Sequence, residues 1–462
     1  MIRKKIKELK TMIPILNDIS QIGDLEVNGV SINTKELERG NLFVPLKGQK
    51  RDGHEFVEEA FKRGASASLW QKNVPNPPKH LPLIFVDDPL DTLQQLARAY
   101  RKELSSLKVV AVTGSNGKTT TKDMVAALLS RKYKVQKTIG NFNNHIGLPL
   151  TILHLKKETE IAVLEMGMNH FGEIDFLSKM AEPDAAIITN IGDAHLQELG
   201  SREGILKAKL EILNGLKQCG LFIYPGDEPL FLNHKKLVGS QWKKKTFGKS
   251  KANDLYVKSV KTGKDGTEFS VNISDEIFQL PIIGEYNVSN AMAAMLIAKE
   301  WGITFQEMNR GFSQLKLSKM RMEMMRGING STIINDAYNA SPTSMKAAID
   351  TIGKLSGFKK KIVLLGDMFE LGEREREFHR SVGESIDQNR IHFVFTYGKL
   401  AKYIAEGARK NFSAQHVSFF KDQKELLQRL KSMLDEGTLL FLKASRGMRL
   451  EKIMEELLEK NA

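Results

Sequence analysis

The segment AVTGSNGKTTT contains the residue types of a phosphate-binding loop. Gly114 and Gly117 allow backbone N–H groups to turn toward phosphate oxygens. Lys118 supplies a positive charge, and Thr119 can offer its hydroxyl to Mg²⁺. The usual pattern G-x-x-x-x-G-K-[ST] has a glycine where this chain has Val112. An apolar strand-like stretch precedes the loop and a helix-forming stretch follows it, so we predict a nucleotide site rather than a chance glycine turn.

Three further side chains could act beside bound phosphates. Glu165 ends the apolar stretch IAVLE, where a carboxylate can reach a metal-bound phosphate. His195 follows the apolar stretch AAIITN, and Lys209 lies in the helix-like segment KAKLEI. Each also has an ordinary interpretation, as a surface acid, a structural histidine and a routine charge partner. Their assignment therefore depends on the loop.

Near the carboxy terminus, polar residues again follow apolar strands. Asp336 and Asp367 each close such a strand, although the residues after Asp336 also read as a simple turn. Lys443, Ser445 and Arg446 come just after the apolar stretch TLLFL. Arg446 can receive a carboxylate through two parallel hydrogen bonds, and the alternative is a salt-bridged surface cation.

The elements that must hold these residues alternate between strand-like and helix-like segments. KVVAV, IAVLEM, AAIITN and LFIYP form one such series, and TIIND, KIVLLGD, HFVFTYG and TLLFLKAS form another. This alternation predicts an α/β fold with parallel βαβ units and helices on both faces of the sheets. Open sheets of this kind place ligands at the carboxyl ends of their strands.

Composition narrows the class of protein. The chain has 462 residues, of which 41% are hydrophobic and 27% charged, and no apolar run approaches the length of a membrane span. The single cysteine, Cys219, and the lack of a secretory signal predict a cytoplasmic protein. The net charge of +14 is spread along the chain, so we predict a solvated basic surface and no nucleic-acid partner.

In their order, these motifs resemble the Mur ligases of peptidoglycan synthesis, and the resemblance covers nearly the whole chain. The family's own phosphate loop reads T-G-x-x-G-K-T-T, so Val112 is where that pattern has it. The matching segments are GVSINTKELERGNLFVPLKGQKRDGHEFVEEAFKRGA, VTGSNGKTTTKDM, GNFNNHIGLPLT, LEMGMNHFGEI, TNIGDAHLQELGS, AKLEI, GEYNVSNAMAA, INDAYNASPTS, LLGDMFELG and KASRGM.

The resemblance implies three domains: an amino-terminal domain for a uridine nucleotide (1–105), a central P-loop ATPase (106–317) and a carboxy-terminal Rossmann-like domain (318–462). It also implies ATP-dependent amide bond formation through an acyl phosphate. The implied substrates are a UDP-N-acetylmuramoyl tripeptide and D-Ala-D-Ala, and the implied cofactors are ATP, two Mg²⁺ ions and a CO₂-derived carbamate on Lys209. We expect a monomer.

The same resemblance assigns roles to residues at matching positions. The catalytic residues are Lys118, His195 and Lys209. The ATP-binding residues are Gly114, Ser115, Asn116, Gly117, Lys118, Thr119, Thr120, Asn287, Asn290, Arg321 and Asp336. The metal ligands are Thr119, Glu165, His195 and carbamylated Lys209. The substrate-binding residues are Ser31, Thr34, Lys35, Asn143, Asn144, His145, Asn339, Lys443, Ser445 and Arg446.

Several positions depart from the family's pattern. The uridine motif usually reads S-x-D-S-R, whereas Asn33 lacks the acid's charge and Lys35 lacks the arginine's fork. Leu210 and Ala444 replace common glycines, and Tyr286 replaces a common histidine. None of these changes removes an expected phosphate or metal ligand.

Two alternatives remain. One is another ligase of the same superfamily, adding diaminopimelate or lysine, or a folylpolyglutamate synthase. The diaminopimelate-adding group carries D-N-P-R, which this chain lacks, and the tail KASRGM favours the dipeptide-adding group. The other alternative is an unrelated P-loop ATPase acting on nucleic acid, which would leave the order of the other motifs unexplained.

Overall fold

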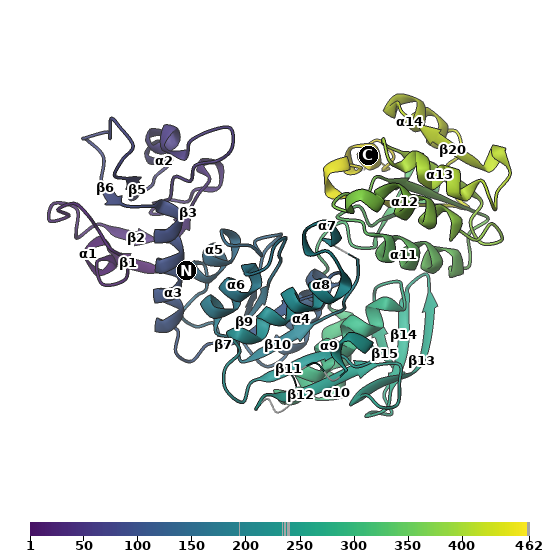
Figure 1. Ribbon diagram of the computed structural model, residues 1–462, viewed down its shortest axis with the longest axis horizontal. Helices are drawn as coiled ribbons and strands as arrows, with labels where there is room; N and C mark the ends of the chain where they lie inside the picture. Colours follow the sequence, from purple (N-terminus) through teal and green to yellow (C-terminus); the bar gives the residue numbers. More distant parts are fainter. Residues whose placement is uncertain (194, 233, 235–236, 238–240, 460–462) are drawn as a thin grey trace. The chain divides into compact units, whose positions relative to one another are not determined.

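The computed structural model describes residues 1–193, 195–232, 234, 237 and 241–459 (Figure 1). The chain separates into two compact units. The first comprises Met1–Thr113, Lys132–Ala186 and Glu211–Leu221, and the second comprises Gly114–Arg131, Ile187–Leu210 and Phe222–Ala462. The three domain ranges given above stay a prediction. Among the described residues, no helix is both long and apolar enough to cross a bilayer.

The amino-terminal part of the first unit is a four-stranded parallel sheet in the order β3-β4-β5-β6. Phe43 and Trp70 belong to a buried core that also includes Val57 and Ala60 of α2. Strands β1 and β2 form a separate antiparallel pair, and α1 follows β1 directly in the sequence. The bounds are β1 Arg3–Lys5, α1 Ile6–Leu9, β2 Glu26–Asn28, β3 Val30–Ser31, β4 Leu42–Phe43, α2 Val57–Lys62, β5 Ala67–Gln71, β6 Leu83–Val86 and α3 Pro89–Glu103.

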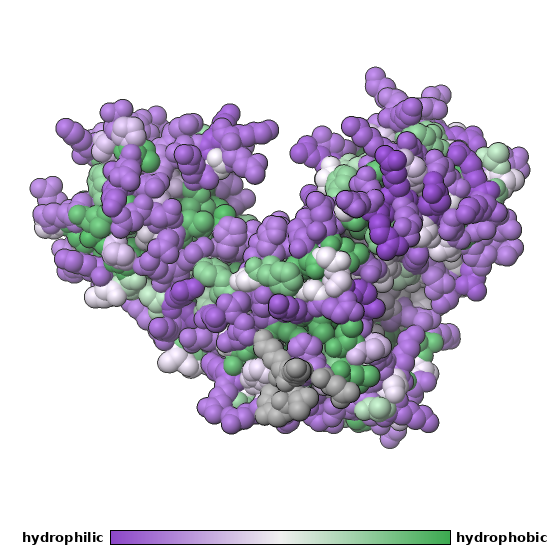
Figure 2. All heavy atoms as spheres, viewed as in Figure 1, coloured by the Kyte–Doolittle hydropathy of each residue, from purple (hydrophilic) through white to green (hydrophobic). Residues whose placement is uncertain are grey.

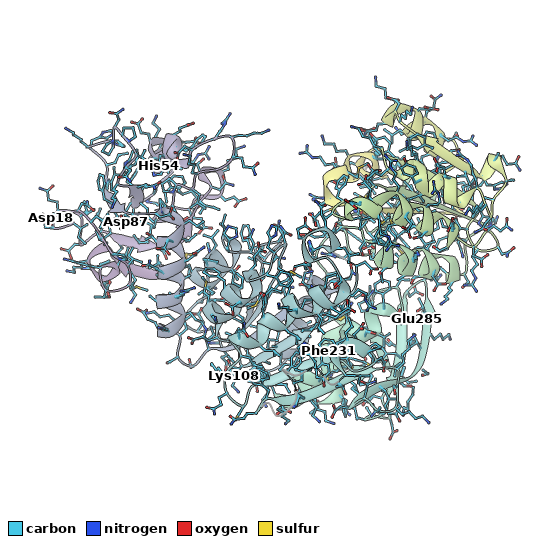
Figure 3. The ribbon with its side chains drawn as sticks, in the orientation of Figure 1. Asp18, His54, Asp87, Lys108, Phe231 and Glu285 are labelled. Carbon is cyan, nitrogen blue, oxygen red and sulfur yellow. The ribbon has the colours of Figure 1, made fainter. Side chains whose placement is uncertain are left out.

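The rest of the first unit is a parallel sheet section in the order β10-β7-β9-β8. Residues 109–113 of β7 are all buried, as expected for a parallel strand covered on both faces. Lys108 marks the amino end of β7 in Figure 3, so the glycine loop follows the opposite, carboxyl end. The bounds are β7 Lys108–Thr113, β8 Val135–Lys137, α5 Gly147–Leu153, β9 Ile161–Glu165, α6 Glu173–Ala181 and β10 Ala185–Ile188.

The second unit begins with the glycine loop and the helix that follows it, and it carries strands in the order β15-β14-β13-β12-β11. Strands β13, β14 and β15 are antiparallel. The nearly all-buried helix α9, which starts just after Glu285 (Figure 3), packs against α4. The bounds are α4 Lys118–Leu129, α7 Leu196–Leu199, α8 Arg202–Lys209, β11 Leu221–Pro225, β12 Lys243–Gly248, β13 Leu255–Gly263, β14 Gly266–Val271, β15 Phe278–Leu280, α9 Tyr286–Glu300 and α10 Phe305–Ser313.

The carboxy-terminal part of the second unit is a six-stranded sheet in the order β16-β17-β21-β18-β19-β20, parallel except for β16. Ile362 and Leu364 of β18 face a core shared with Leu426 and Leu430 of α14, while α11 and α13 also contact β18. The bounds are β16 Glu323–Arg326, β17 Thr332–Asn335, α11 Pro342–Lys354, β18 Lys360–Gly366, α12 Glu375–Glu384, β19 Phe393–Tyr397, α13 Ala401–Ala408, β20 Val417–Phe420, α14 Gln423–Lys431, β21 Thr438–Lys443 and α15 Glu451–Glu455.

The expected α/β fold with parallel sheets is therefore confirmed. Each apolar segment that ends in a polar residue forms a strand, so Glu165, Asp336 and Lys443 lie at or just after the carboxyl ends of strands. Hydrophilic side chains cover much of the face drawn in Figure 2, as expected for a solvated surface.

Candidate active site

The glycine loop packs so closely that its two glycines are required. A Cβ on Gly114 would collide with the Thr189 hydroxyl, and a Cβ on Gly117 would collide with the Asn290 side chain. Gly117 also has φ of 78°, the left-handed conformation that glycine adopts without strain, at the start of α4. The loop therefore reaches the amino end of a helix, where free N–H groups favour an anion.

The loop is held by the segment that follows β10. The backbone N–H groups of Ser115 and Asn116 donate to the carbonyl and side-chain oxygens of Asn190, at 3.1 Å and 3.0 Å. The Thr189 hydroxyl donates to the Asn116 carbonyl at 2.5 Å, and the Gly192 N–H donates to the Ser115 hydroxyl at 2.9 Å. These bonds fix the shape of the loop before any ligand arrives.

Two side chains at the start of α4 face this loop. The Lys118 ammonium donates to the carbonyls of Gly114 at 2.7 Å and Ser115 at 3.3 Å, so its charge lies over the loop. The Thr119 hydroxyl, on a buried residue, accepts a hydrogen bond from Nη2 of Arg321 at 3.2 Å. Thr120 is buried as well.

Lys209 ends helix α8 and is almost completely buried, with 1% of its surface exposed. Burial, and then the charge of Lys118, lower the pKa of the Lys209 ammonium well below its usual value. No described carboxylate lies within ion-pair distance of it. Burial and the nearby Lys118 therefore both favour the neutral amine of Lys209.

His195 stands at the amino end of α7 with φ of 63°. Its Nδ1 lies 3.0 Å from Oε2 of Glu370, a distance typical of an ion pair. The interaction with His195 lowers the pKa of the Glu370 carboxyl. Glu370 carries no sequence signal for this contact, because in LLGDMFELG it is Asp367 that closes the apolar strand.

In the first unit, Glu165 lies at the end of β9, opposite Val112 in the β7–β9 pairing. Its Oε1 accepts a hydrogen bond from the Asn143 amide at 2.8 Å, and the residue is buried. The Asn144 side chain accepts from the backbone N–H groups that begin α5, whereas His145 is exposed. Glu165, a predicted metal ligand, therefore contacts the predicted substrate loop, residues 143–145.

Residues 31–35, the predicted uridine motif, form a tight turn in the first unit. The Ser31 hydroxyl donates to the Asn33 carbonyl at 2.9 Å, and the Asn33 side chain accepts from the Lys35 backbone N–H at 3.1 Å. The Thr34 hydroxyl donates to Glu59 at 3.3 Å. Asn33 thus supplies the turn contact that the family's acid could also make, while the Lys35 side chain is exposed.

Arg321 is arranged to receive an anion. Its guanidinium lies over the ring of Tyr338, 4.1 Å from the centroid. Its Nε is buried and has no hydrogen-bond partner among the described residues, although its Nη2 contacts Thr119. A buried guanidinium N–H without an acceptor is costly, so this geometry fits a phosphate oxygen.

Asp336 lies just past β17 and is held on both sides. Its Oδ2 is 2.5 Å from the ammonium of the buried Lys443, and its Oδ1 accepts from the Met322 N–H at 3.2 Å. Lys443 also donates to the Asn339 carbonyl at 3.1 Å. Asp336, a predicted ATP-binding residue, and Lys443, a predicted substrate-binding residue, therefore form a buried ion pair.

The remaining carboxy-terminal residues occupy different environments. The Ser445 hydroxyl accepts from the Phe369 N–H at 3.0 Å. Arg446 lies 3.2 Å from Glu451 and about half of its side chain is exposed. The Asn339 side chain accepts from the next backbone N–H. Among Lys443, Ser445 and Arg446, which follow β21, Arg446 is therefore the most exposed to solvent.

The two asparagines of α9 support the phosphate-loop helix. The Asn290 amide donates to Asn287 at 3.2 Å, and the Thr121 hydroxyl donates to Asn290 at 3.2 Å. Both asparagines are buried. Burial, and then the nearby Asp336, raise the pKa of the Tyr286 phenol well above its usual value. Tyr286 therefore stays neutral where the family usually has a histidine.

Within the described ranges, no cluster of three or more His, Cys, Asp or Glu side chains could hold a metal ion. Such a cluster would not include Thr119 or a carbamylated Lys209, which are two of the predicted metal ligands. The glycine loop and the Nε of Arg321 fit an anionic nucleotide, and the lowered pKa of Lys209 fits a carbamate. The second unit brings these three features together.

The chain matches three family descriptions in order: "Mur ligase family, catalytic domain" at residues 26–101, "Mur ligase middle domain" at 112–298 and "Mur ligase, glutamate ligase domain" at 320–446. It is 50% identical to a UDP-N-acetylmuramoyl-tripeptide–D-alanyl-D-alanine ligase of Bacillus subtilis, over 99% of both chains.

Solved structures give the same result. The MurF structure from Acinetobacter baumannii has a TM-score of 0.88 and 30% identity, with 100% of each chain covered. The MurF ligase from Thermotoga maritima, solved in complex with ADP, has a TM-score of 0.80 and 32% identity, over 93% of this chain and 97% of that one.

Proposed function

The chain belongs to the Mur ligase family, and from this we infer that it joins D-Ala-D-Ala to a UDP-N-acetylmuramoyl tripeptide in an ATP-dependent reaction. One observation carries the inference: half of all residues are identical, over essentially full length, to a relative named for that activity. The preformed glycine loop supplies the nucleotide site that the reaction requires.

The chemistry explains the positive groups around the loop. A carboxylate is a poor electrophile, so the terminal carboxylate of the tripeptide first accepts the γ-phosphoryl group of ATP. The amine of the dipeptide then attacks the acyl carbon and phosphate leaves. The first step brings two anions together, and Lys118, Arg321 and the N–H groups of the loop reduce their repulsion.

We propose Thr119 and Glu165 as protein ligands of one Mg²⁺, and His195 with carbamylated Lys209 as those of a second. Bound Mg²⁺ would neutralise phosphate charge. The strand pairing of Glu165 with Val112, close in sequence to the loop, supports the first assignment. Thr119 is buried, and its hydroxyl oxygen accepts a hydrogen bond from Arg321, which leaves a second lone pair for a cation.

The state of Lys209 supports its proposed modification. Only a neutral amine attacks CO₂, and the lowered pKa of Lys209 favours that form. In the reaction the nitrogen forms a bond to carbon and loses a proton, which produces an anion with two oxygens. Such an anion suits a hard cation, whereas an ammonium would repel it.

The remaining assignments are also part of the proposal. Asn287 and Asn290 would lie on the adenine side, and Asp336 at the ribose end. The uridine nucleotide would contact Ser31, Thr34 and Lys35, and the muramoyl part would contact the loop 143–145. The dipeptide would meet Asn339, Lys443, Ser445 and Arg446. We further propose that the enzyme acts as a monomer in the cytoplasm, with domains at 1–105, 106–317 and 318–462.

Phosphate release tests the function directly. The assay contains ATP, Mg²⁺, the UDP-muramoyl tripeptide and D-Ala-D-Ala, with mass spectrometry to identify the product. We expect phosphate and UDP-muramoyl pentapeptide in equal amounts. No phosphate should be released when either the tripeptide or D-Ala-D-Ala is left out. An unchanged rate without the dipeptide would contradict the proposal.

A further inference from the structure

A buried aspartate fixes the segment that leads into the carboxy-terminal sheet. Asp123 lies in α4, one turn after the glycine loop, and 1% of its surface is exposed. Its Oδ2 accepts two hydrogen bonds from Ser318, from the backbone N–H at 3.0 Å and from the hydroxyl at 2.9 Å. Two bonds to one residue fix both its position and its orientation.

The same segment carries Arg321 to the start of α4. Nη2 of Arg321 donates to Thr119 at 3.2 Å, and its guanidinium lies over Tyr338. The next N–H, of Met322, donates to Asp336 at 3.2 Å. Residues 318–322 are thus held from α4 at two points and from the end of β17 at a third.

The backbone of this segment is strained around Arg321. Met320 and Met322 have φ of 61° and 50°, which non-glycine side chains rarely adopt. Such conformations persist where surrounding contacts over-determine them, and they occur often at functional sites. The bonds from Asp123 to Ser318 are contacts of this kind.

We propose that Asp123 is a positioning residue for the ligase reaction. It acts through Ser318, which sets the path of residues 318–322 so that Arg321 meets the nucleotide phosphates beside Thr119. Asp123 itself is buried and directs its oxygen at Ser318, so it does not need to touch ATP. The inference rests on the proposed nucleotide role of the glycine loop and Arg321.

A double-mutant cycle separates positioning from general stabilisation. We expect Asp123→Ala to lower kcat/KM for ATP and to weaken ADP binding by about ten- to a hundredfold, the range for losing hydrogen bonds to a charged group. In an Arg321→Ala background, Asp123→Ala should lower kcat/KM for ATP and the affinity for ADP by less than about twofold, because its effect passes through Arg321. ADP binding is measured by titration calorimetry and does not depend on turnover.

Two variants of Ser318 refine the test. Ser318→Ala removes the hydroxyl bond and keeps the N–H bond, so we expect a loss of about three- to tenfold. Ser318→Thr keeps both donors and should remain near wild type. If Asp123→Ala does not fold, the cycle of Ser318→Ala with Arg321→Ala decides the question.

Asp422→Ala is the matched control, because Asp422 likewise accepts a backbone N–H, that of Glu425, at the start of α14. It should leave ATP kinetics and ADP binding unchanged. The positioning role would be overturned if the fold-losses in kcat/KM of Asp123→Ala and Arg321→Ala simply multiply in the double variant. It would also be overturned if the Asp123 and Ser318 variants keep wild-type kcat/KM for ATP and wild-type ADP binding. A wild-type enzyme without dipeptide-dependent phosphate release would instead refute the proposed function.

Discussion

Two buried lysines in the second unit have opposite electrostatic environments. Lys443 lies 2.5 Å from Asp336 and donates to a carbonyl, so its charge is compensated. Lys209 is equally buried but faces the like charge of Lys118, and the pKa of its ammonium is lowered well below its usual value. Burial alone therefore does not define the role of a lysine. A carboxylate beside Lys443 compensates its charge, whereas burial and the like charge of Lys118 favour the neutral amine of Lys209.

Removing Lys209 should have the largest effect. Lys209→Ala should lower the ligase rate by about a thousandfold, the loss expected for a group that stabilises charge in the site. Added formate or acetate should restore part of the rate, because a short carboxylate can replace the carbamate. Phosphate release measured with and without these acids checks this. Full activity in the simple variant would refute the metal-binding role.

Removing the paired lysine should act differently. Lys443→Met leaves the Asp336 carboxylate buried without its cation, which should cost about 3–5 kcal/mol of unfolding free energy. Carboxylic acids should not rescue its activity. The double variant Lys443→Met/Asp336→Asn should regain much of the stability, measured by urea unfolding. Rescue of Lys443→Met by acetate would remove the distinction between the two lysines.

The pH dependence of stability should also separate the two lysines. Between its lowered folded pKa and the unfolded value near 10.5, Lys209 is neutral when folded and protonated when unfolded. The unfolded state then binds more protons, so stability rises with pH in this window. In CO₂-free buffer, Lys209→Met should flatten this rise and raise the Tm at pH 7 by about 2–5 °C. An unchanged slope in thermal unfolding would mean that Lys209 is charged in the folded protein.

The half-buried pair of His195 and Glu370 should give the smallest effect. About half of the Glu370 side chain is exposed, so Glu370→Gln should change the unfolding free energy by less than about 1 kcal/mol. The pKa of Glu370 is lowered, so its contribution is present at neutral pH and disappears as pH falls through that pKa. Wild type and variant should therefore differ at pH 7 and converge in acid, as measured by urea unfolding.

Local sequence predicted the features that depend on neighbouring residues. Gly114, Gly117 and Lys118 lie together in the chain, and the strands before the loop and before Glu165 read directly as apolar runs. Contacts between distant segments had no such signal. The pairing of His195 with Glu370 joins residues far apart in the chain and depends on the folded arrangement.

The tether of Asp123 shows the same limit. Asp123 reads from sequence as a polar position in an ordinary helix, and Ser318 as part of a connection. Their contact becomes visible only when the segment before β16 is placed against α4. The charge state of Lys209 also depends on burial and on the nearby Lys118, neither of which the helix-like segment KAKLEI reveals.

Carbon-13 NMR with labelled bicarbonate tests the contrast between the two lysines most directly. The wild-type enzyme, Lys209→Ala and Lys443→Met are each equilibrated with ¹³C-bicarbonate and compared. We predict one carbamate resonance in the wild type, retained in Lys443→Met and absent from Lys209→Ala. No carbamate signal in the wild type, or one that persists in Lys209→Ala, would contradict the assignment of Lys209 as the reactive amine.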